Sequence, residues 1–224
     1  MSDLCDRIAT LLTRMAAGLL AGPVREQSAG WLAESRDLAR EIRIVDEALR
    51  RAEESIRLNP RRVMLPRTEF NLRHVLETLE YAAITVRGIA RSIADNAGLA
   101  EDQSPVRDQD IRDRLAAVLE ELAGAVSAHG ELTRPHSPAI HNLVAPEMRE
   151  HLAKAHDRQA SLSELLGSDP AVRPVGWPLR GELVSHLDRL RAELEAAGPG
   201  EEHLPQQERS RRPWRSAWQR GRRR

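Results

Sequence analysis

The stretch Leu72-Arg-His-Val-Leu-Glu-Thr-Leu-Glu-Tyr-Ala-Ala-Ile-Thr-Val-Arg-Gly-Ile-Ala-Arg-Ser-Ile93 decides the fold class. Its apolar positions alternate by steps of four and three residues, and they run Leu72, Leu76, Leu79, Ala83, Val86, Ala90, Ile93 and Ala97. This spacing places one stripe on one helix face and favours shallow, coiled-coil-like crossing. Flanking residues such as Ala82 and Ile89 widen the stripe, and a wide stripe predicts a helix with several neighbours in a bundle.

The same spacing recurs in three other segments, and a shorter first helix carries Leu4, Ile8, Leu11 and Met15. The three series are Trp31, Ser35, Leu38, Ile42, Val45, Leu49, Ala52 and Ile56; Ile111, Leu115, Val118, Leu122, Ala125, His129 and Leu132; and Met148, Leu152, Ala155, Gln159, Leu162 and Leu166. No segment shows the period-two alternation of a strand. We therefore predict an all-α fold, an antiparallel bundle of about six helices without a sheet.

Two long helices, about residues 29–58 and 69–97, are predicted to form an antiparallel hairpin over residues 28–98, because a short connection at residues 60–66 joins them. The predicted caps and stops of this hairpin are Ser28, Asn59-Pro60, Thr68 and Gly98. Elsewhere we expect Ser104-Pro105 to begin a helix that Gly130 ends, Pro146 and Pro178 to begin two more, and Gly167 and Gly198-Pro199 to end them. The Pro-rich stretch Leu132–Pro146 is predicted to be a loop.

The helical pattern stops near Gly198, so we predict a helical domain over residues 1–198 and a disordered basic tail over residues 199–224. The 34 basic and 34 acidic residues of the chain balance, but the tail has eight arginines against three glutamates. Its possible membrane contacts are Arg211, Arg212, Trp214, Arg215, Trp218 and Arg220. Tryptophan prefers the membrane interface, and arginine attracts anionic lipid. A tail without any binding role is the alternative, and nucleic acid is disfavoured because the acidic body would repel phosphate.

We predict no catalytic, cofactor-binding or metal-binding residues, and therefore a protein that is not an enzyme. None of the eight histidines has an acidic residue three positions before it, as carboxylate-bridged di-metal bundles require. Glu147/His151 and Glu182/His186, spaced i,i+4, are expected to be ordinary surface pairs. Cys5, the single cysteine, is expected to be structural and not a nucleophile. An enzyme with a hidden metal site remains a third interpretation.

Composition indicates a bacterial protein of the cytoplasm. All basic residues except Lys154 are arginine, which is typical of a GC-rich genome, and a single cysteine fits a reducing compartment. The beginning of the chain lacks the features of a signal peptide. The longest nearly apolar run, Met15–Val24, is shorter than the roughly 20 residues that a membrane helix needs.

Two segments resemble the cytosolic helical region of actinobacterial aromatic acid exporter proteins, of the fusaric acid resistance family. They are Ala48-Leu-Arg-Arg-Ala-Glu-Glu-Ser-Ile-Arg-Leu-Asn-Pro-Arg-Arg62 and the stretch Leu72–Ile93 quoted above. In that family a long helix with an Arg/Glu-rich face ends near an Asn-Pro-Arg-Arg-like turn, and a second long helix follows. The resemblance is strongest over about Ser28–Leu132, and it does not extend to the family's membrane helices.

The resemblance implies a non-enzymatic helical domain that works at the cytoplasmic face of the cell membrane, with a membrane transporter subunit or a second copy of itself as its partner. A truncated product, a stand-alone paralogue and a docking subunit are all compatible with the missing membrane half. The alternative is a free-standing helical-bundle adaptor or regulatory protein without a link to transport.

Overall fold

The computed structural model describes residues 2–22, 24–57, 66–100, 104–134, 138–167 and 177–198. Over these ranges the chain contains six α-helices, one short 3₁₀ helix and no strand, so the predicted all-α class is confirmed. The elements are α1 (Ser2–Ala21), α2 (Val24–Arg57), α3 (Pro66–Gly98), η2 (Pro105–Arg107), α4 (Gln109–Leu132), α5 (Pro138–Gly167) and α6 (Trp177–Ala197).

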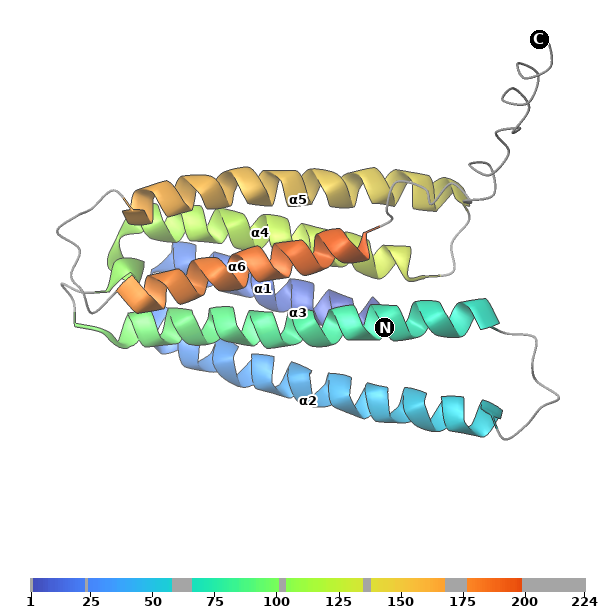
Figure 1. The fold of residues 1–224 in the computed structure, drawn as a ribbon. Coiled ribbons are helices and arrows are strands. Elements are labelled where there is room, and N and C mark those ends of the chain that lie inside the picture. The colour runs from blue at the N-terminus through green and yellow to red at the C-terminus, as the bar shows by residue number, and fades with distance from the viewer. Residues whose placement is uncertain are drawn as a thin grey trace, which may run out of the picture.

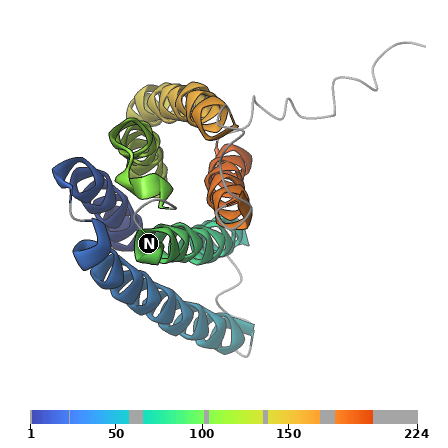
Figure 2. The same cartoon turned by 90° about the vertical axis from the view of Figure 1, so that its left-hand side faces the viewer.

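Successive helices run in opposite directions along one bundle (Figure 1). The main packing pairs are α1 with α4, α4 with α5, α2 with α3, and α3 with α6, and α5 and α6 also touch. The end-on view shows these helices as a ring, with α2 on its outer side against α3 and α1 (Figure 2). The predicted antiparallel hairpin of two long helices is therefore present as α2 and α3.

The predicted stripes form the core. On α3, every stripe position from Leu76 to Ala97 is buried, and so are the stripes of α4 from Ile111 to His129 and of α5 from Met148 to Leu166. α1 buries ten of its 20 residues, including Leu4, Ile8, Leu11 and Met15. Small Ala and medium-sized Leu side chains fill most of this interior, and Trp31 of α2 contributes a large buried ring, so the helices pack closely.

Burial of the α2 stripe fades along the helix. Trp31, Ser35, Leu38 and Ile42 are buried, Val45 and Leu49 are half-buried, and Ala52 is exposed. The cause is the outer position of α2, which packs against α3 and α1. Where the second half of α2 lies beside the first half of α3, polar contacts therefore help to hold the hairpin together. Arg73 of α3 donates to both carboxylate oxygens of Glu53 of α2, at 2.9 and 2.7 Å, and lies 3.6 Å from Asp46.

Rings on one helix fill the space left by glycines on another. A Cβ added at Gly124 of α4 would lie 2.5 Å from the ring of His151 of α5, and one at Gly88 of α3 would lie 2.5 Å from the ring of His186 of α6. Gly130 of α4 accommodates Cys5 of α1 in the same way, with 2.7 Å to its Cβ. These close approaches fix the axial positions of the neighbouring helices.

The predicted N-caps of the two long helices, Ser28 and Thr68, are wrong. α2 begins at Val24, and Ser28 lies inside it, buried, with its hydroxyl donating to the Arg25 carbonyl at 3.2 Å. The chain turns earlier than predicted because Gly22, with φ of 116°, ends α1 in a conformation that only glycine adopts readily. α3 begins at Pro66, so Thr68 is inside the helix, as expected when proline occupies the first helical position. The predicted end at Gly98 is confirmed.

The boundaries of α4 also differ from the prediction. Ser104 and Pro105 begin η2, whereas Asp108 is the N-cap of α4 and accepts from the N–H groups of Asp110 and Ile111 at 2.8 and 3.4 Å. Gly130 does not end α4, and the helix continues to Leu132. Because Gly130 has no side chain, Cys5 of α1 can pack closely against it. Thr133 is the C-cap residue, and its hydroxyl donates to the Gly130 carbonyl at 2.7 Å.

The loop predicted over Leu132–Pro146 is largely helix. α5 begins at Pro138, where proline fits the first position, and Pro146 lies inside it, so Pro146 does not begin the helix. Packing of Ala145 and Met148 in the core supports the helix on both sides of this proline. The predicted helix ends at Gly167 and Gly198 are confirmed, since α5 ends at Gly167 and α6 at Ala197. Pro178 lies in the first turn of α6.

Two predicted segments lie outside the described residues: the Asn59-Pro60 turn with the hairpin connection, and the tail over residues 199–224. Among the helices that are described, none is both long and apolar enough to cross a membrane.

Candidate functional site

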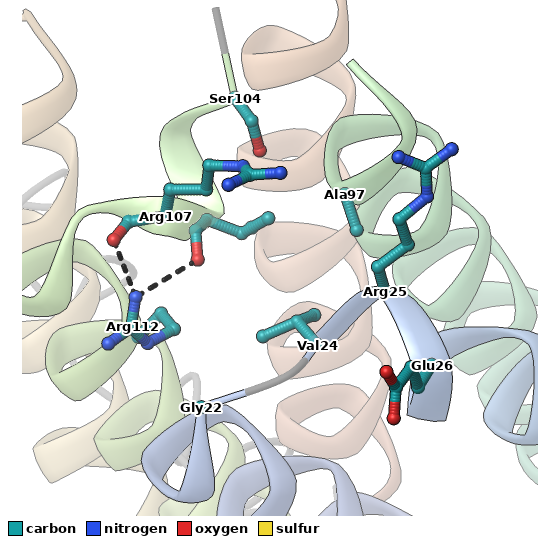
Figure 3. Close-up of a pocket in the computed structure, with 9 residues that line it drawn as sticks. Gly22, Val24, Arg25, Glu26, Ala97, Ser104, Arg107 and Arg112 are labelled. Carbon is teal, nitrogen blue, oxygen red and sulfur yellow. Dashed lines mark hydrogen bonds between the residues drawn. The ribbon is translucent and has the colours of Figure 1, made fainter. Parts of the chain in front are cut away.

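A pocket of about 400 Å³ opens at the end of the bundle where four helices meet. We call it the end pocket, and Figure 3 shows its lining. The lining residues are Gly22, Val24, Arg25, Glu26, Ala97, Ser104, Val106, Arg107 and Arg112. They come from the end of α1, the first turn of α2, the last turn of α3, and the η2–α4 junction, so the pocket exists only when these elements are assembled.

The sharp turn between α1 and α2 forms one wall. Gly22 takes its positive φ there, and its carbonyl accepts from the N–H of Val24 at 2.7 Å. This turn directs the N-terminus of α2, with Arg25 and Glu26 in its first turn, toward the pocket (Figure 3). The first N–H groups of a helix lack intrahelical acceptors, and they give this end a partial positive charge.

Arg112 holds the floor of the end pocket together. Its Nε donates to the carbonyl of Leu19 at 3.1 Å, and its Nη1 donates to the carbonyls of Val106 and Arg107 at 3.3 and 2.6 Å. The guanidinium thereby caps the C-terminal end of α1. Figure 3 shows its two bonds to η2. All its acceptors are neutral, so Arg112 contributes a positive charge that no carboxylate of the described residues offsets.

Charged side chains of both signs line the pocket. Of the described lining residues, Arg25, Arg107 and Arg112 are basic and Glu26 is acidic, and Arg107 already has an interaction partner. Arg25 is exposed at the rim, and among the described residues no acidic side chain pairs with it. Val24, Ala97 and Val106 are buried and give the pocket an apolar wall.

Ser104 is the polar residue of the lining whose hydrogen bonding is incomplete. It is 7 % exposed, and within the described part of the chain its hydroxyl has no hydrogen-bond partner. Although Ser104 precedes η2 as its N-cap, the hydroxyl makes no capping bond. Figure 3 shows it pointing into the pocket beside the Arg107 side chain. The end pocket thus combines basic side chains, a buried hydroxyl and an apolar wall.

A cluster of polar side chains lies between α4 and α5. Glu121, which is 8 % exposed, accepts from His151 at 2.8 Å and pairs with Arg158 at 2.8 Å. The prediction that His151 pairs with Glu147 is wrong, because the ring turns across the helix interface to Gly124 and Glu121. The ring of His186 likewise turns to Gly88 of α3. Both histidines therefore take part in packing between helices.

Cys5 of α1 and His129 of α4 are buried near the C-terminal end of α4, far from the end pocket. Burial raises the pKa of the Cys5 thiol to about 12, a value that suits a structural side chain and not a nucleophile at neutral pH. Burial, with a smaller effect from His74, lowers the pKa of His129 to about 4. The ring nitrogens of His129 have no hydrogen-bond partner in the described part of the chain. His129 is therefore neutral at pH 7 and acts as a core residue.

The sequence did not predict the end pocket. The predicted contacts Arg211, Arg212, Trp214, Arg215, Trp218 and Arg220 all lie outside the described residues. The end-pocket residues are scattered over positions 22–112, and their only sequence signal is that they cluster at predicted helix ends, next to Gly22-Pro23, Gly98 and Ser104-Pro105. Over the described ranges, no group of three or more His, Cys, Asp or Glu side chains is arranged to hold a metal ion.

Comparison with known proteins adds no further identification: no family model, no curated protein and no solved structure matches this chain.

Proposed function

We propose that this chain is a non-enzymatic helical docking domain that works at the cytoplasmic face of the cell membrane, against the cytoplasmic part of a transport protein of the aromatic acid exporter type. The observation that carries the proposal is the α2–α3 hairpin. Most of the residues that resemble the exporter family, Ala48–Arg57 and Leu72–Ile93, are on these two helices, and α2 lies on the outside of the ring, where a partner can reach it (Figure 2).

The hairpin offers a surface suited to a helical partner. A groove of about 260 Å³, which we call the hairpin groove, lies between α2 and α3. It is lined by Ala39, Ile42, Arg43, Glu80, Ala83, Ile84 and Arg87. Ile84 is 52 % exposed, and charges of both signs surround it. An apolar residue within a charged rim is typical of the contact surface of a non-obligate interface.

The alternative function, a free-standing adaptor or regulatory protein, is favoured by a different observation. The apolar stripes of α1, α3, α4 and α5 are buried within the chain itself, so the fold of these helices does not require a partner. A bundle with its own core can act away from any membrane. The two functions therefore differ in location and partner, and not in fold.

Cell fractionation tests the proposal. We expect the full chain to sediment with membranes at low salt, and part of it to remain there at 0.5 M salt, because salt screens contacts with lipid more than an apolar contact with a protein. Ile84→Asp should abolish the salt-resistant part. Ile44→Asp is the matched control, since Ile44 is similarly exposed (59 %) but lies outside the groove lining.

A chain that stays in the soluble fraction under all conditions would overturn the membrane function and favour the adaptor. Equal loss with Ile84→Asp and Ile44→Asp would show that the hairpin groove is not the contact surface. Self-association through the groove would appear as a change of mass in light scattering without membranes, and Ile84→Asp would remove it.

A further inference from the structure

We propose that an exposed strip of α3 is a self-association surface, on which a second copy of this chain packs its own α3 in the antiparallel direction. The strip, which we call the α3 strip, consists of exposed side chains along one line of the helix: His74, Glu77, Tyr81, Ile84, Arg87 and Arg91. The inference goes beyond the docking function proposed above, because it concerns the chain alone, although the α3 strip and the hairpin groove both include Ile84.

Tyr81 and Ile84 give the α3 strip an apolar centre. They are 54 % and 52 % exposed and, three residues apart, they are neighbours on the helix surface. The other large apolar side chains that are exposed in the described part of the chain are each alone on their helices: Leu20, Ile44 and Leu143. An aromatic and an aliphatic side chain at the centre of a charged surface are typical of a protein–protein contact.

Carboxylates gather on the N-terminal side of this apolar centre. Glu77 is exposed there, and burial together with the nearby carboxylates of Asp46 and Glu77 raises the pKa of Glu80. Arg73 also lies on this side, but its guanidinium donates to Glu53 of α2, at 2.9 and 2.7 Å. Glu77 itself forms no ion pair within the described part of the chain.

Basic side chains lie on the C-terminal side of the apolar centre. Arg87 is exposed and, among the described residues, has no ion-pair partner. Arg91 follows one turn later and pairs with Asp95 at 3.4 Å. Arg43 of α2 lines the hairpin groove together with Arg87. The α3 strip therefore changes from acidic to basic across its apolar centre.

This order of charges is complementary to a second copy in the antiparallel direction. If Tyr81 lies opposite Ile84 of the second copy, and Ile84 opposite its Tyr81, the two apolar centres cover each other. Glu77 precedes this centre by four residues, and Arg87 follows it by three. At 1.5 Å per residue, Glu77 of each copy therefore meets Arg87 of the other to within about 2 Å along the axis.

A parallel arrangement would instead place Glu77 against Glu77 and Arg87 against Arg87. The antiparallel contact has two-fold symmetry, so every favourable charge pair forms twice. α2 and α6 flank α3 on its two sides (Figure 2), so the contact is narrow. We therefore expect a weak dimer, because a small interface leaves little free energy after the cost of association.

Sedimentation velocity of the purified full chain tests the proposal. We expect a monomer–dimer equilibrium with a dissociation constant of roughly 10–100 µM, measured over a range of about 10–500 µM. Glu77→Arg and Arg87→Glu should each weaken dimerisation about tenfold, because each places like charges together at two sites. The variant with both changes should dimerise like the unaltered chain, because reversal of both charges restores the opposite-charge pairs.

A mixture of the two single variants gives a second readout. They should form a heterodimer, although each alone is mainly monomeric. In the mixed pair the new arginine of one chain meets the new glutamate of the other, and the remaining Arg87 meets the remaining Glu77. Glu164→Arg is the matched control and should leave dimerisation unchanged, since Glu164 is an exposed glutamate of α5, which is not one of the main packing partners of α3. Circular dichroism checks that each variant is folded.

A chain that stays monomeric throughout the concentration range would overturn the proposal. So would equal effects of Glu77→Arg and Glu164→Arg, a double variant no better than the single variants, or a mixture that forms no heterodimer. Because sedimentation of the purified chain involves no membrane or transporter, its failure would leave the docking function untouched, and failure of the fractionation test would leave the antiparallel dimer untouched.

Discussion

At the scale of single residues, the interior of this bundle depends on histidine rings placed against glycines. In the α4–α5 contact, a methyl group at Gly124 would lie 2.5 to 2.7 Å from three atoms of the His151 ring. Real Cβ atoms do not approach so closely, and both the ring and the α4 backbone are held by their neighbours. The glycine is therefore required by packing and not by backbone conformation, since in the described chain only Gly22 among the glycines has a positive φ.

Gly124→Ala is expected to lower the free energy of unfolding by about 1–3 kcal/mol, the usual effect of overpacking. Urea unfolding followed by circular dichroism measures it. Gly30→Ala is the matched control, because nothing lies within 4 Å of a Cβ built at this position inside α2. That variant should be more stable by about 0.5–1 kcal/mol through helix propensity. If both variants lose stability equally, the ring contact does not decide the effect.

His129 should make the bundle sensitive to acid. Its pKa is about 4 in the folded chain, below the usual 6.5, because burial disfavours the charged ring. A base with a lowered folded pKa contributes its full stability above pH 6.5. This stability is lost as the pH falls from 6.5 toward 4, because the unfolded chain takes up the proton first. The loss amounts to about 3 kcal/mol.

His129→Leu should remove this part of the pH dependence, and it should not reduce stability at pH 7, because the native ring nitrogens lack partners among the described residues. Unfolding in urea at pH 7, 5.5 and 4.5 provides the measurement. His156→Ala, at an exposed position of α5, serves as the control and should retain the pH dependence of the unaltered chain. An unchanged slope in His129→Leu would assign acid sensitivity to other groups.

At the scale of elements, the α2–α3 hairpin combines a well-packed half with a polar half. Ile42 is 1 % exposed, whereas Leu49, seven residues later on the same stripe, is only half-buried. Ile42→Ala should cost about 2–5 kcal/mol of unfolding free energy, as core truncations usually do. Leu49→Ala should cost less than half of that. Chemical denaturation checks both, and equal losses would mean that the two ends of α2 are buried to the same extent.

The existence of the helices could be predicted from sequence because stripe periodicity reports burial directly, and the pairing of α2 with α3 could be predicted because their connection is short. The other helix pairs were not predicted. Even the imperfect stripe positions Ser35, His129 and Gln159 are buried as the period requires. The residues at which helices begin and end were harder to predict. Ser28 and Thr68 have the right chemistry for caps, but capping depends on where the chain enters the helix, and Gly22 and Pro66 determined that. The partner of His151 lies 30 residues away at Glu121, where within-helix spacing has no predictive power.

The end pocket was beyond sequence reasoning for a related reason. Arg25 and Arg112 look like any other of the many arginines in this chain. What distinguishes them is that the helix ends on which they lie converge, and periodicity says nothing about which ends meet. Ser104 was predicted to begin α4, but it precedes η2 instead, and its hydroxyl makes no capping bond because Asp108 caps α4.

At the scale of the whole molecule, the basic tail should be separable from the bundle. All members of the described core lie between Leu4 and Leu194. Deletion of residues 209–224 should therefore leave the helical circular dichroism signal and the melting temperature unchanged. It should weaken binding to anionic vesicles at low salt, because each arginine near such a surface contributes about 1 kcal/mol. Vesicle sedimentation measures this, with neutral vesicles as the control. Unchanged binding would remove the proposed role of Arg211, Trp214 and Trp218.

The tie between Arg112 and the Leu19 carbonyl spans 93 residues of sequence. During synthesis α1 therefore leaves the ribosome long before α4, its main packing partner, and at typical elongation rates the delay is roughly 5 to 20 s. α1 buries ten of its 20 residues, and in that interval those that pack against α4 are still exposed. The face of α1 that packs against α4 therefore needs temporary protection, from other parts of the nascent chain or from a chaperone, until α4 is synthesised.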